Sequence, residues 1–202
     1  LEKNISTCSD RVLNDWNAEL VNVYSVVRDC CDDLMTMLNV MQEQYEKKPE
    51  ETYAHLRAST FDLPLEQAAR TIFLNKAGFN GLYRQNKAGK FNVPWGKKPK
   101  VGFYSKDNLH ACALALARVR SFHTGDFAPA IAEAGPGDVV YLDPPYSPHS
   151  DTSNFTAYTS EGFSMKDQER VAQTTRQLVA QGAHVVVSNN DVPAMYELLA
   201  GF

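Results

Sequence analysis

The stretch DVVYLDPPY at residues 138–146 decides the fold, because an apolar run passes directly into an acid, two prolines and a tyrosine. Proline fixes φ and has no backbone N–H, so a strand that pairs through its backbone must end there. A run that is apolar on both faces is typical of a central parallel strand, and open α/β sheets place their sites at the carboxyl ends of such strands. The sequence therefore predicts a site at the end of a strand over 138–142, formed by Asp143, Pro144, Pro145 and Tyr146.

Strands and helices alternate around this stretch. We expect strands at 11–15, 120–124, 138–142 and 184–189, and helical segments over 16–46, 65–77, from 107, 164–182 and from 191. Alternation at this spacing predicts an α/β protein with a parallel, doubly wound sheet. Residues 47–60 are polar and mixed and are assigned no element, and 78–104 is interpreted as a loop with short hairpin-like pieces. The region 47–106 therefore interrupts the alternation as an inserted, partly helical module, which leaves 1–46 and 107–202 for the main domain.

Length and composition exclude several classes of protein. The chain has 202 residues, 44% of them hydrophobic and 22% charged, which suits one medium domain with an insertion. No segment is apolar enough for a membrane span and no signal peptide opens the chain, so we expect a cytoplasmic protein. The four cysteines lack C-x-x-C spacing and are expected as reduced thiols, and the five scattered histidines indicate no metal site.

Basic residues are concentrated in one part of the chain. Between residues 70 and 106 there are nine lysines and arginines and no acid, so the rest of the chain has 11 basic against 24 acidic residues, a net charge of −13. An acid-free block of this size favours binding to a polyanion, because a solvated face usually mixes both signs. The alternative is a basic loop that only maintains solubility.

The residue types at 143–146 suit methylation of an amine. The exocyclic amine of a nucleobase is a poor nucleophile because its lone pair is conjugated with the ring. Two acceptors, the Asp143 carboxylate and the Pro144 carbonyl, can take its two N–H bonds and hold the nitrogen in line with a methyl donor. Pro145 stiffens the turn, and Tyr146 offers a ring on which a base can stack. The alternative is a strand-terminating turn with no chemical role.

A family resemblance extends over nearly the whole chain. DPPY at 143–146, together with FLNKAGFNGLYRQNKAGKFNVPWG at 73–96, LNDWNAELVNVY at 13–24 and SDTSNFTAY at 150–158, resembles the Dam-type DNA N6-adenine methyltransferases of the D12 class, alpha group. The 73–96 block is far more specific than DPPY alone. The resemblance implies a Rossmann-like fold with a target-recognition domain inserted at 47–106. It also implies S-adenosyl-L-methionine (SAM) as methyl donor, double-stranded DNA as substrate, commonly at GATC, and no obligate protein partner.

The resemblance implies a role for individual residues. Asp15 would accept hydrogen bonds from the SAM ribose, although the residues alone also allow Asp15 as the N-cap of the following helix. The other cofactor residues would be Asp126, Phe127 and Asp143, and Arg84 would read a guanine. Phe79 and Asn80 would enter the duplex to support the strand left when adenine flips, and Leu82 and Pro94 would contact base-pair edges. Further DNA contacts are implied for Asn86, Asn92, Lys97 and Lys98, and a closing lid or base pocket for Asn154, Phe155 and Tyr158.

Departures from the family pattern leave alternatives open. The family's F-x-G-x-G turn would fall before Leu1 and its last strands after Phe202, so we expect an incomplete chain. Gly135-Pro136-Gly137 precedes a strand and is interpreted as a tight turn rather than a cofactor motif. The alternatives to an adenine methyltransferase are a DNA-binding remnant without catalysis and an N4-cytosine or RNA amine methyltransferase, the latter disfavoured by the 73–96 block.

Overall fold

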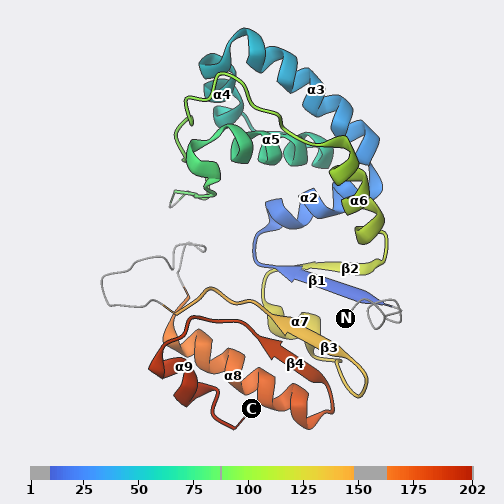
Figure 1. Ribbon diagram of the computed structural model, residues 1–202, viewed down its shortest axis with the longest axis vertical. Coiled ribbons are helices and arrows are strands. Elements are labelled where there is room, and N and C mark those ends of the chain that lie inside the picture. Colours follow the sequence, from blue (N-terminus) through green and yellow to red (C-terminus); the bar gives the residue numbers. More distant parts are fainter. Residues whose placement is uncertain (1–9, 87, 148–162, 202) are drawn as a thin grey trace. The chain divides into compact units, whose positions relative to one another are not determined.

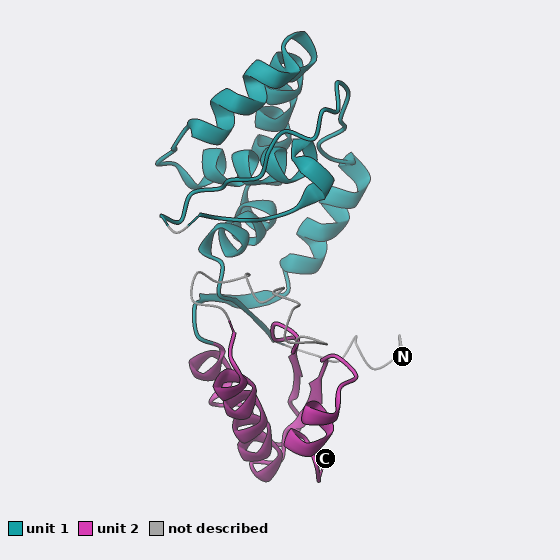
Figure 2. Ribbon diagram, turned by 90° about the vertical axis from the view of Figure 1, so that its left-hand side faces the viewer, with its two compact units in different colours: residues 1–126 teal, residues 127–202 magenta. Residues whose placement is uncertain are grey.

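The computed structural model describes residues 10–86, 88–147 and 163–201. Contacts within the chain divide it into two compact units, Leu1–Asp126 and Phe127–Phe202, which are coloured separately in Figure 2. Each unit is considered by itself below. The three predicted lid residues Asn154, Phe155 and Tyr158 lie outside the described residues.

The first unit combines a pair of parallel strands with helices (Figure 1). Strand β1 pairs with β2, and Leu13 lies opposite Phe122. The elements are β1 (Arg11–Asp15), α2 (Ala18–Asp29), α3 (Cys31–Lys47), α4 (Pro49–Ala58), α5 (Pro64–Ala77), the 3₁₀ turn η1 (Phe79–Gly81), α6 (Lys106–Leu116) and β2 (Val119–Thr124).

Two details at the start of this unit differ from the sequence expectation. The N-cap of α2 is Asn17, whose Oδ1 accepts hydrogen bonds from the backbone N–H groups of Glu19 and Leu20. The alternative of Asp15 as the cap was therefore wrong, and the Asp15 carboxylate instead accepts the Asn17 N–H. The segment 16–46 is also two helices, because Cys30 leaves the helical conformation at φ −139° and ψ 40°.

The core of the first unit lies among its helices. Tyr45, Tyr53 and Phe73 are fully buried, and the rings of Tyr45 and Phe73 meet edge to face at 5.5 Å. Tyr53 comes from α4, in the stretch 47–60 to which the sequence analysis assigned no element. Helix α4 was missed because only Tyr53 and Leu56 are buried in an otherwise polar segment.

The predicted loop with hairpin-like pieces at 78–104 is confirmed. Isolated antiparallel bridges join Gly78 to Trp95 and Gln85 to Phe91. Core tyrosines hold the loop by its carbonyls, because the Tyr53 hydroxyl donates to Val93 O at 3.0 Å and the Tyr45 hydroxyl donates to Lys98 O. The loop crosses itself closely, since a Cβ at Gly96 would lie 2.8 Å from Gly78 O. The loop is thus fixed from the helical core beneath it.

The second unit is a parallel strand pair packed on a helix. Its elements are α7 (Phe127–Ile131), β3 (Val139–Leu142), α8 (Met165–Ala180), β4 (His184–Val187) and α9 (Pro193–Leu198). The expected capping box of Ser164 and Asp167 opens α8, and the expected tight turn at Gly135-Pro136-Gly137 is present, with Gly137 at φ +90°.

Strand β3 departs from the expectation of burial on both faces. In the described part of the chain Val140 and Leu142 are buried in the core of the second unit, whereas Val139 and Tyr141 are 66% and 62% exposed. The α/β content and the parallel pairing are confirmed. The doubly wound sheet and the domain limits at 46/47 and 106/107 stay predictions. None of the helices among the described residues has the length and apolar character needed to span a bilayer.

Candidate functional site

The acid-Pro-Pro-Tyr turn lies where the sequence predicts, at the carboxyl end of β3. Leu142, the last residue of β3, pairs with Val187, the last residue of β4, so Asp143 and Ser188 follow side by side. The Ser188 hydroxyl donates a hydrogen bond to Asp143 Oδ1 at 2.5 Å. Asp143 is exposed and Tyr146 is 44% exposed, so the carboxylate and the ring are accessible to a ligand.

Some of the backbone carbonyls of this turn accept hydrogen bonds within the described part of the protein, and others do not. Leu142 O accepts the Ser188 N–H, and Pro145 O accepts the Gln168 side-chain amide at 2.8 Å. Within the described ranges no hydrogen bond reaches Pro144 O. The two acceptors that the chemistry requires, the Asp143 carboxylate and the Pro144 carbonyl, thus belong to consecutive residues directly after β3.

A second set of polar residues holds the turn, and the sequence analysis gave none of them a role. Asn189 Oδ1 accepts the Ser147 N–H at 3.0 Å, Asn190 Nδ2 donates to Ser147 O, and Asn189 Nδ2 donates to Gln168 Oε1. Gln168 is a buried polar residue of α8. The available signal was the polar triplet Ser188-Asn189-Asn190 directly after an apolar strand, because carboxyl ends of parallel strands meet at one edge.

Replacing Ser188 with alanine should lower kcat by about 10- to 100-fold, because a hydrogen bond to a charged group contributes roughly 1.5–3 kcal/mol. The loss should fall on kcat rather than on the Kd for the substrate, since Ser188 orients Asp143. Tyr141→Phe is the matched comparison, because the Tyr141 hydroxyl donates to Ser188 Oγ at 3.2 Å and not to Asp143. It should lower kcat less than Ser188→Ala does, since the bond from Ser188 to Asp143 remains. A Ser188→Ala enzyme with unchanged kcat would contradict this orienting role.

Two of the predicted cofactor acids lie together at the edge of the β1–β2 pair. Asp15 is the last residue of β1, and its backbone O accepts the Gly125 N–H at 3.0 Å. The Asn14 side chain donates to the carbonyls of Gly125 and Asp126. Both acids are half-buried. The pKa of Tyr24, a residue of α2 that the sequence analysis did not select, is raised. The larger cause is burial of its hydroxyl, and the smaller is the charge of the nearby Asp15 carboxylate.

Phe127 begins α7 and belongs to the second unit. Its ring packs against the core of that unit, and the guanidinium of Arg170 lies 4.8 Å from the ring centroid. The cation therefore covers one face of the ring. This contact accounts for the position of Phe127 without any ligand, and its predicted role beside SAM stays a prediction.

Phe79 and Asn80, predicted to enter the duplex, and Leu82, predicted to contact base-pair edges, stand on a tight, exposed turn. Phe79 and Leu82 are 49% and 50% exposed, and Asn80 between them has φ 52°. The Asn75 side chain donates to Gly81 O at 2.7 Å, and the Phe79 N–H donates to Pro94 O at 3.0 Å. The exposed ring of Phe79 suits insertion between stacked bases, and the exposed side chain of Leu82 suits contact with base edges.

The hairpin that follows presents Arg84. The Asn92 N–H donates to Arg84 O at 3.0 Å, while Arg84 Nε donates to Asn92 Oδ1 at 2.8 Å. Arg84 Nη2 also lies 3.4 Å from Asn92 O. The Asn86 side chain accepts the N–H groups of Ala88 and Lys90 and so builds the hairpin turn. Asn86 and Asn92, both predicted as DNA contacts, thus also shape the hairpin itself.

Exposed cations surround this loop, but Arg70 is not among them. In the described part of the chain none of the ion pairs involves the exposed set Lys76, Arg84, Lys90, Lys97, Lys98, Lys100 and Lys106. Lys98 Nζ is 3.4 Å from Lys76 O, and Lys97 has φ 53°. The Arg70 side chain is only 13% exposed, and its guanidinium donates hydrogen bonds to Leu56 O and Arg57 O. Arg70 therefore stabilises the packing of α4 and α5. Pro94 is exposed beside Phe79.

The acid-Pro-Pro-Tyr turn after a parallel strand in the second unit, and the basic loop with exposed apolar residues in the first, are features expected of the class of nucleic-acid amine methyltransferases. The family model for the D12 class N6 adenine-specific DNA methyltransferases matches residues 4–202. The chain therefore belongs to this family of SAM-dependent, adenine-specific enzymes.

Curated relatives agree with this membership. The chain is 38% identical over 198 residues to the Type II methyltransferase M1.LlaDCHI of Lactococcus lactis subsp. cremoris, covering 95% of this chain and 69% of that protein. It is 35% identical over 193 residues to the DNA N-6-adenine-methyltransferase of Escherichia phage P1, covering 94% of this chain and 25% of the phage protein. It is 34% identical over 184 residues to the DNA adenine methylase of Salmonella typhi, covering 89% and 64% respectively.

Proposed function

We propose that the protein transfers a methyl group from SAM to N6 of adenine in double-stranded DNA, in a GATC or related site and in the cytoplasm of a bacterial or phage-infected cell. The observation that carries the proposal is the pair of acceptors at the end of β3: the exposed Asp143 carboxylate, held by Ser188, and the Pro144 carbonyl, to which no described residue donates. Membership of the D12 class supports adenine in DNA as the substrate.

At this turn the residues of the chain would bind and orient the amine. Asp143 accepts one N–H of the adenine amino group and Pro144 O accepts the other, which directs the nitrogen lone pair at the methyl donor. The negative charge of Asp143 would stabilise the positive charge that develops on N6 as the methyl group leaves the donor sulfur for the nitrogen, and one N6 proton would then be lost to solvent. Tyr146 stacks on the purine ring, and Gln168 and Asn189 keep the turn in one conformation.

The residues at the β1–β2 edge fit a nucleoside. The half-exposed carboxylate of Asp15 provides acceptors for a ribose diol, and Asp126 lies beside it at the end of the adjacent strand. When bound, SAM supplies an electrophilic methyl group on a sulfonium. Asp15, Asp126 and Phe127 would hold it in a Rossmann-like, doubly wound sheet, and residues 47–106 would form the inserted recognition domain.

The loop at 79–98 would read the DNA. Arg84 would contact a guanine, while Phe79 and Asn80 would fill the space left by a flipped adenine. Extrusion of a base costs a few kcal/mol, which stacking on Tyr146 and the inserted side chains would offset. Leu82 and Pro94 would contact base edges, and Asn86, Asn92, Lys97 and Lys98 the backbone.

Methylation of duplex DNA by the full-length protein tests the proposal. With labelled SAM, a GATC-containing duplex should gain label, and digestion to nucleosides should release labelled N6-methyl-2′-deoxyadenosine. A duplex in which the adenine is replaced should stay unlabelled. Absence of label in any adenine-containing duplex would favour the alternative of a DNA-binding remnant, and label on cytosine N4 or on RNA would indicate the other alternative.

A further inference from the structure

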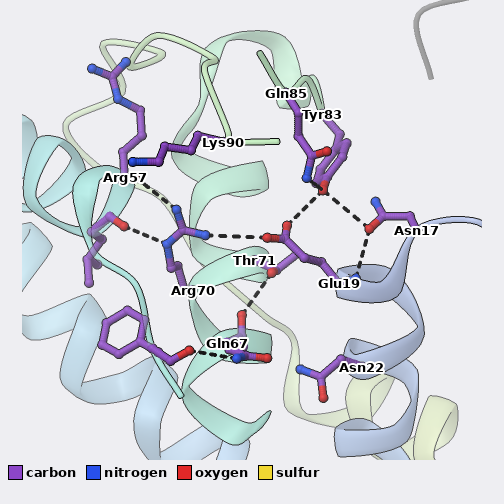
Figure 3. A network of polar contacts seen from close by, with 12 residues as sticks. Asn17, Glu19, Asn22, Arg57, Gln67, Arg70, Thr71, Tyr83, Gln85 and Lys90 are labelled. Atoms are coloured by element: carbon purple, nitrogen blue, oxygen red, sulfur yellow. Dashed lines mark hydrogen bonds and ion pairs between the residues drawn. The ribbon is translucent and has the colours of Figure 1, made fainter. Parts of the chain in front are cut away.

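A hydrogen-bonded network in the first unit joins the turn after β1 to the predicted DNA-reading loop (Figure 3). The Tyr83 hydroxyl is at its centre. It lies 2.9 Å from Glu19 Oε2 and 3.4 Å from Asn17 Oδ1, and it accepts a hydrogen bond from Gln85 Nε2 at 2.7 Å. Tyr83 and Glu19 are 64 residues apart in the sequence.

On one side, this network reaches the predicted cofactor acid. Asp15 Oδ1 accepts the Asn17 N–H at 2.7 Å, and Asn17 Oδ1 accepts the Glu19 N–H at 3.0 Å. Residues 15–20 are therefore one hydrogen-bonded turn. A ligand that hydrogen-bonds to the Asp15 carboxylate would act on the same turn that holds the partners of Tyr83.

On the other side, Tyr83 is part of the hairpin that carries Arg84. Its ring meets the buried Phe91 edge to face at 5.8 Å, and the next residues pair with the opposite arm through the Gln85–Phe91 bridge. Because successive side chains of an extended segment point to opposite sides, Arg84 faces outward while Tyr83 faces the helices. A shift of the Tyr83 ring would therefore move the backbone that positions Arg84.

Glu19 is held from the opposite side as well. Its Oε1 lies 3.9 Å from Arg70 Nη1, and the Arg70 guanidinium donates to the Leu56 carbonyl at 2.8 Å and to the Arg57 carbonyl at 3.0 Å. The Glu19 carboxylate thus lies between the Arg70 guanidinium and the Tyr83 hydroxyl. These contacts hold the N-terminal turn of α2 against the loop.

The chemistry of the hydroxyl provides two alternative arrangements. A phenol has one proton to donate, and two acceptors, Glu19 Oε2 and Asn17 Oδ1, lie within reach. The shorter, charge-assisted bond to Glu19 is the one formed in this structure. Displacement of Asn17 by a ligand at Asp15 would change the balance between these two bonds, and coupling between sites requires an element with two such discrete states.

We propose that Tyr83 and Glu19 are positioning residues that couple cofactor occupancy at Asp15 to the placement of Arg84 on DNA. The inference rests on the proposed function, since it takes Asp15 as a cofactor ligand and Arg84 as a base reader. Reciprocity then follows: cofactor bound at Asp15 tightens binding of cognate DNA, and cognate DNA tightens binding of the cofactor by the same factor.

Tyr83→Phe tests the proposal because it removes only the hydroxyl. The measurement is the Kd of full-length protein for a GATC duplex with and without saturating S-adenosylhomocysteine. Wild type should bind the duplex about 5- to 50-fold more tightly with the nucleoside present, a factor typical of coupled sites, and Tyr83→Phe should bind it equally, within about twofold, in both conditions. Glu19→Gln, which keeps an acceptor for the hydroxyl, should retain more coupling than Glu19→Ala.

Tyr104→Phe is the matched control, because its hydroxyl donates to Asn39 Oδ1 at 2.8 Å on an exposed surface outside the network. It should retain the wild-type ratio of affinities, and thermal unfolding of both phenylalanine variants shows whether stability contributes. An unchanged ratio in Tyr83→Phe, or a wild-type ratio of one, would overturn this inference while adenine methylation by the wild type still stands. Wild-type protein that methylates no adenine would defeat the proposed function as well.

Discussion

Substitution of Asp143 by alanine or asparagine is expected to reduce methyl transfer by at least about a thousandfold while DNA affinity stays within about threefold of wild type. The carboxylate accepts an N–H of the target amine and stabilises the positive charge that forms on N6, and preorganised groups of this kind contribute a factor on the order of 10²–10³ or more to kcat. Asparagine keeps the size of the side chain and an oxygen for the Ser188 hydroxyl, so it separates loss of charge from loss of shape.

The same strand offers a matched control for this prediction. Asp138 immediately precedes β3, is exposed, and accepts the Gly135 N–H at 2.9 Å in the turn before the strand. Asp138→Asn should therefore affect stability slightly and leave kcat near wild type. Single-turnover rates with labelled SAM and Kd values for a GATC duplex measure both effects. Turnover above about a tenth of wild type in Asp143→Asn would exclude Asp143 from the chemistry.

The parts of the fold and site that the sequence predicted are those encoded locally. Apolar runs followed by polar or proline residues located β3 and β4, and the Ser164–Asp167 capping box located the start of α8. The short strands β1 and β2 were located by the acid that ends the first and the Gly125-Asp126-Phe127 segment that follows the second. Asp143 was predicted because the two prolines that stop the strand adjoin it. In each case a few consecutive residues contain the whole physical cause.

What the sequence could not predict depends on contacts between distant residues. Ser188 is 45 residues from Asp143, and Tyr83 is 64 residues from Glu19, so neither hydrogen bond leaves a local pattern. The resemblance predicted Asn86 and Asn92 as DNA contacts, but it did not indicate that their side chains shape the hairpin. The count of basic residues similarly included Arg70, whose guanidinium is bonded to helix carbonyls.

The second large effect is expected at Arg84. Its Nε and one Nη2 hydrogen face Asn92, which leaves the outer edge of the guanidinium, with parallel donors on Nη1 and Nη2, for the O6 and N7 acceptors of guanine. Arg84→Ala should therefore lose about 1–3 kcal/mol of discrimination at one guanine, roughly 5- to 150-fold in kcat/KM between cognate and substituted duplexes. Arg84→Lys should recover part of the DNA affinity but not the discrimination, because lysine lacks the planar fork.

Lys90→Ala provides the comparison, since Lys90 is an exposed cation in the same hairpin and has no predicted base contact. Lys90→Ala should weaken binding equally for all duplexes. It should also reduce the slope of log Kd against log salt concentration by the amount expected for about one phosphate contact. Asn92→Ala should resemble Arg84→Ala in a milder form, because the guanidinium keeps its charge and loses the partner that orients it. A loss in Arg84→Ala that is the same for every sequence would instead make Arg84 a phosphate contact, and the reader of the guanine would then have to come from another residue of the loop.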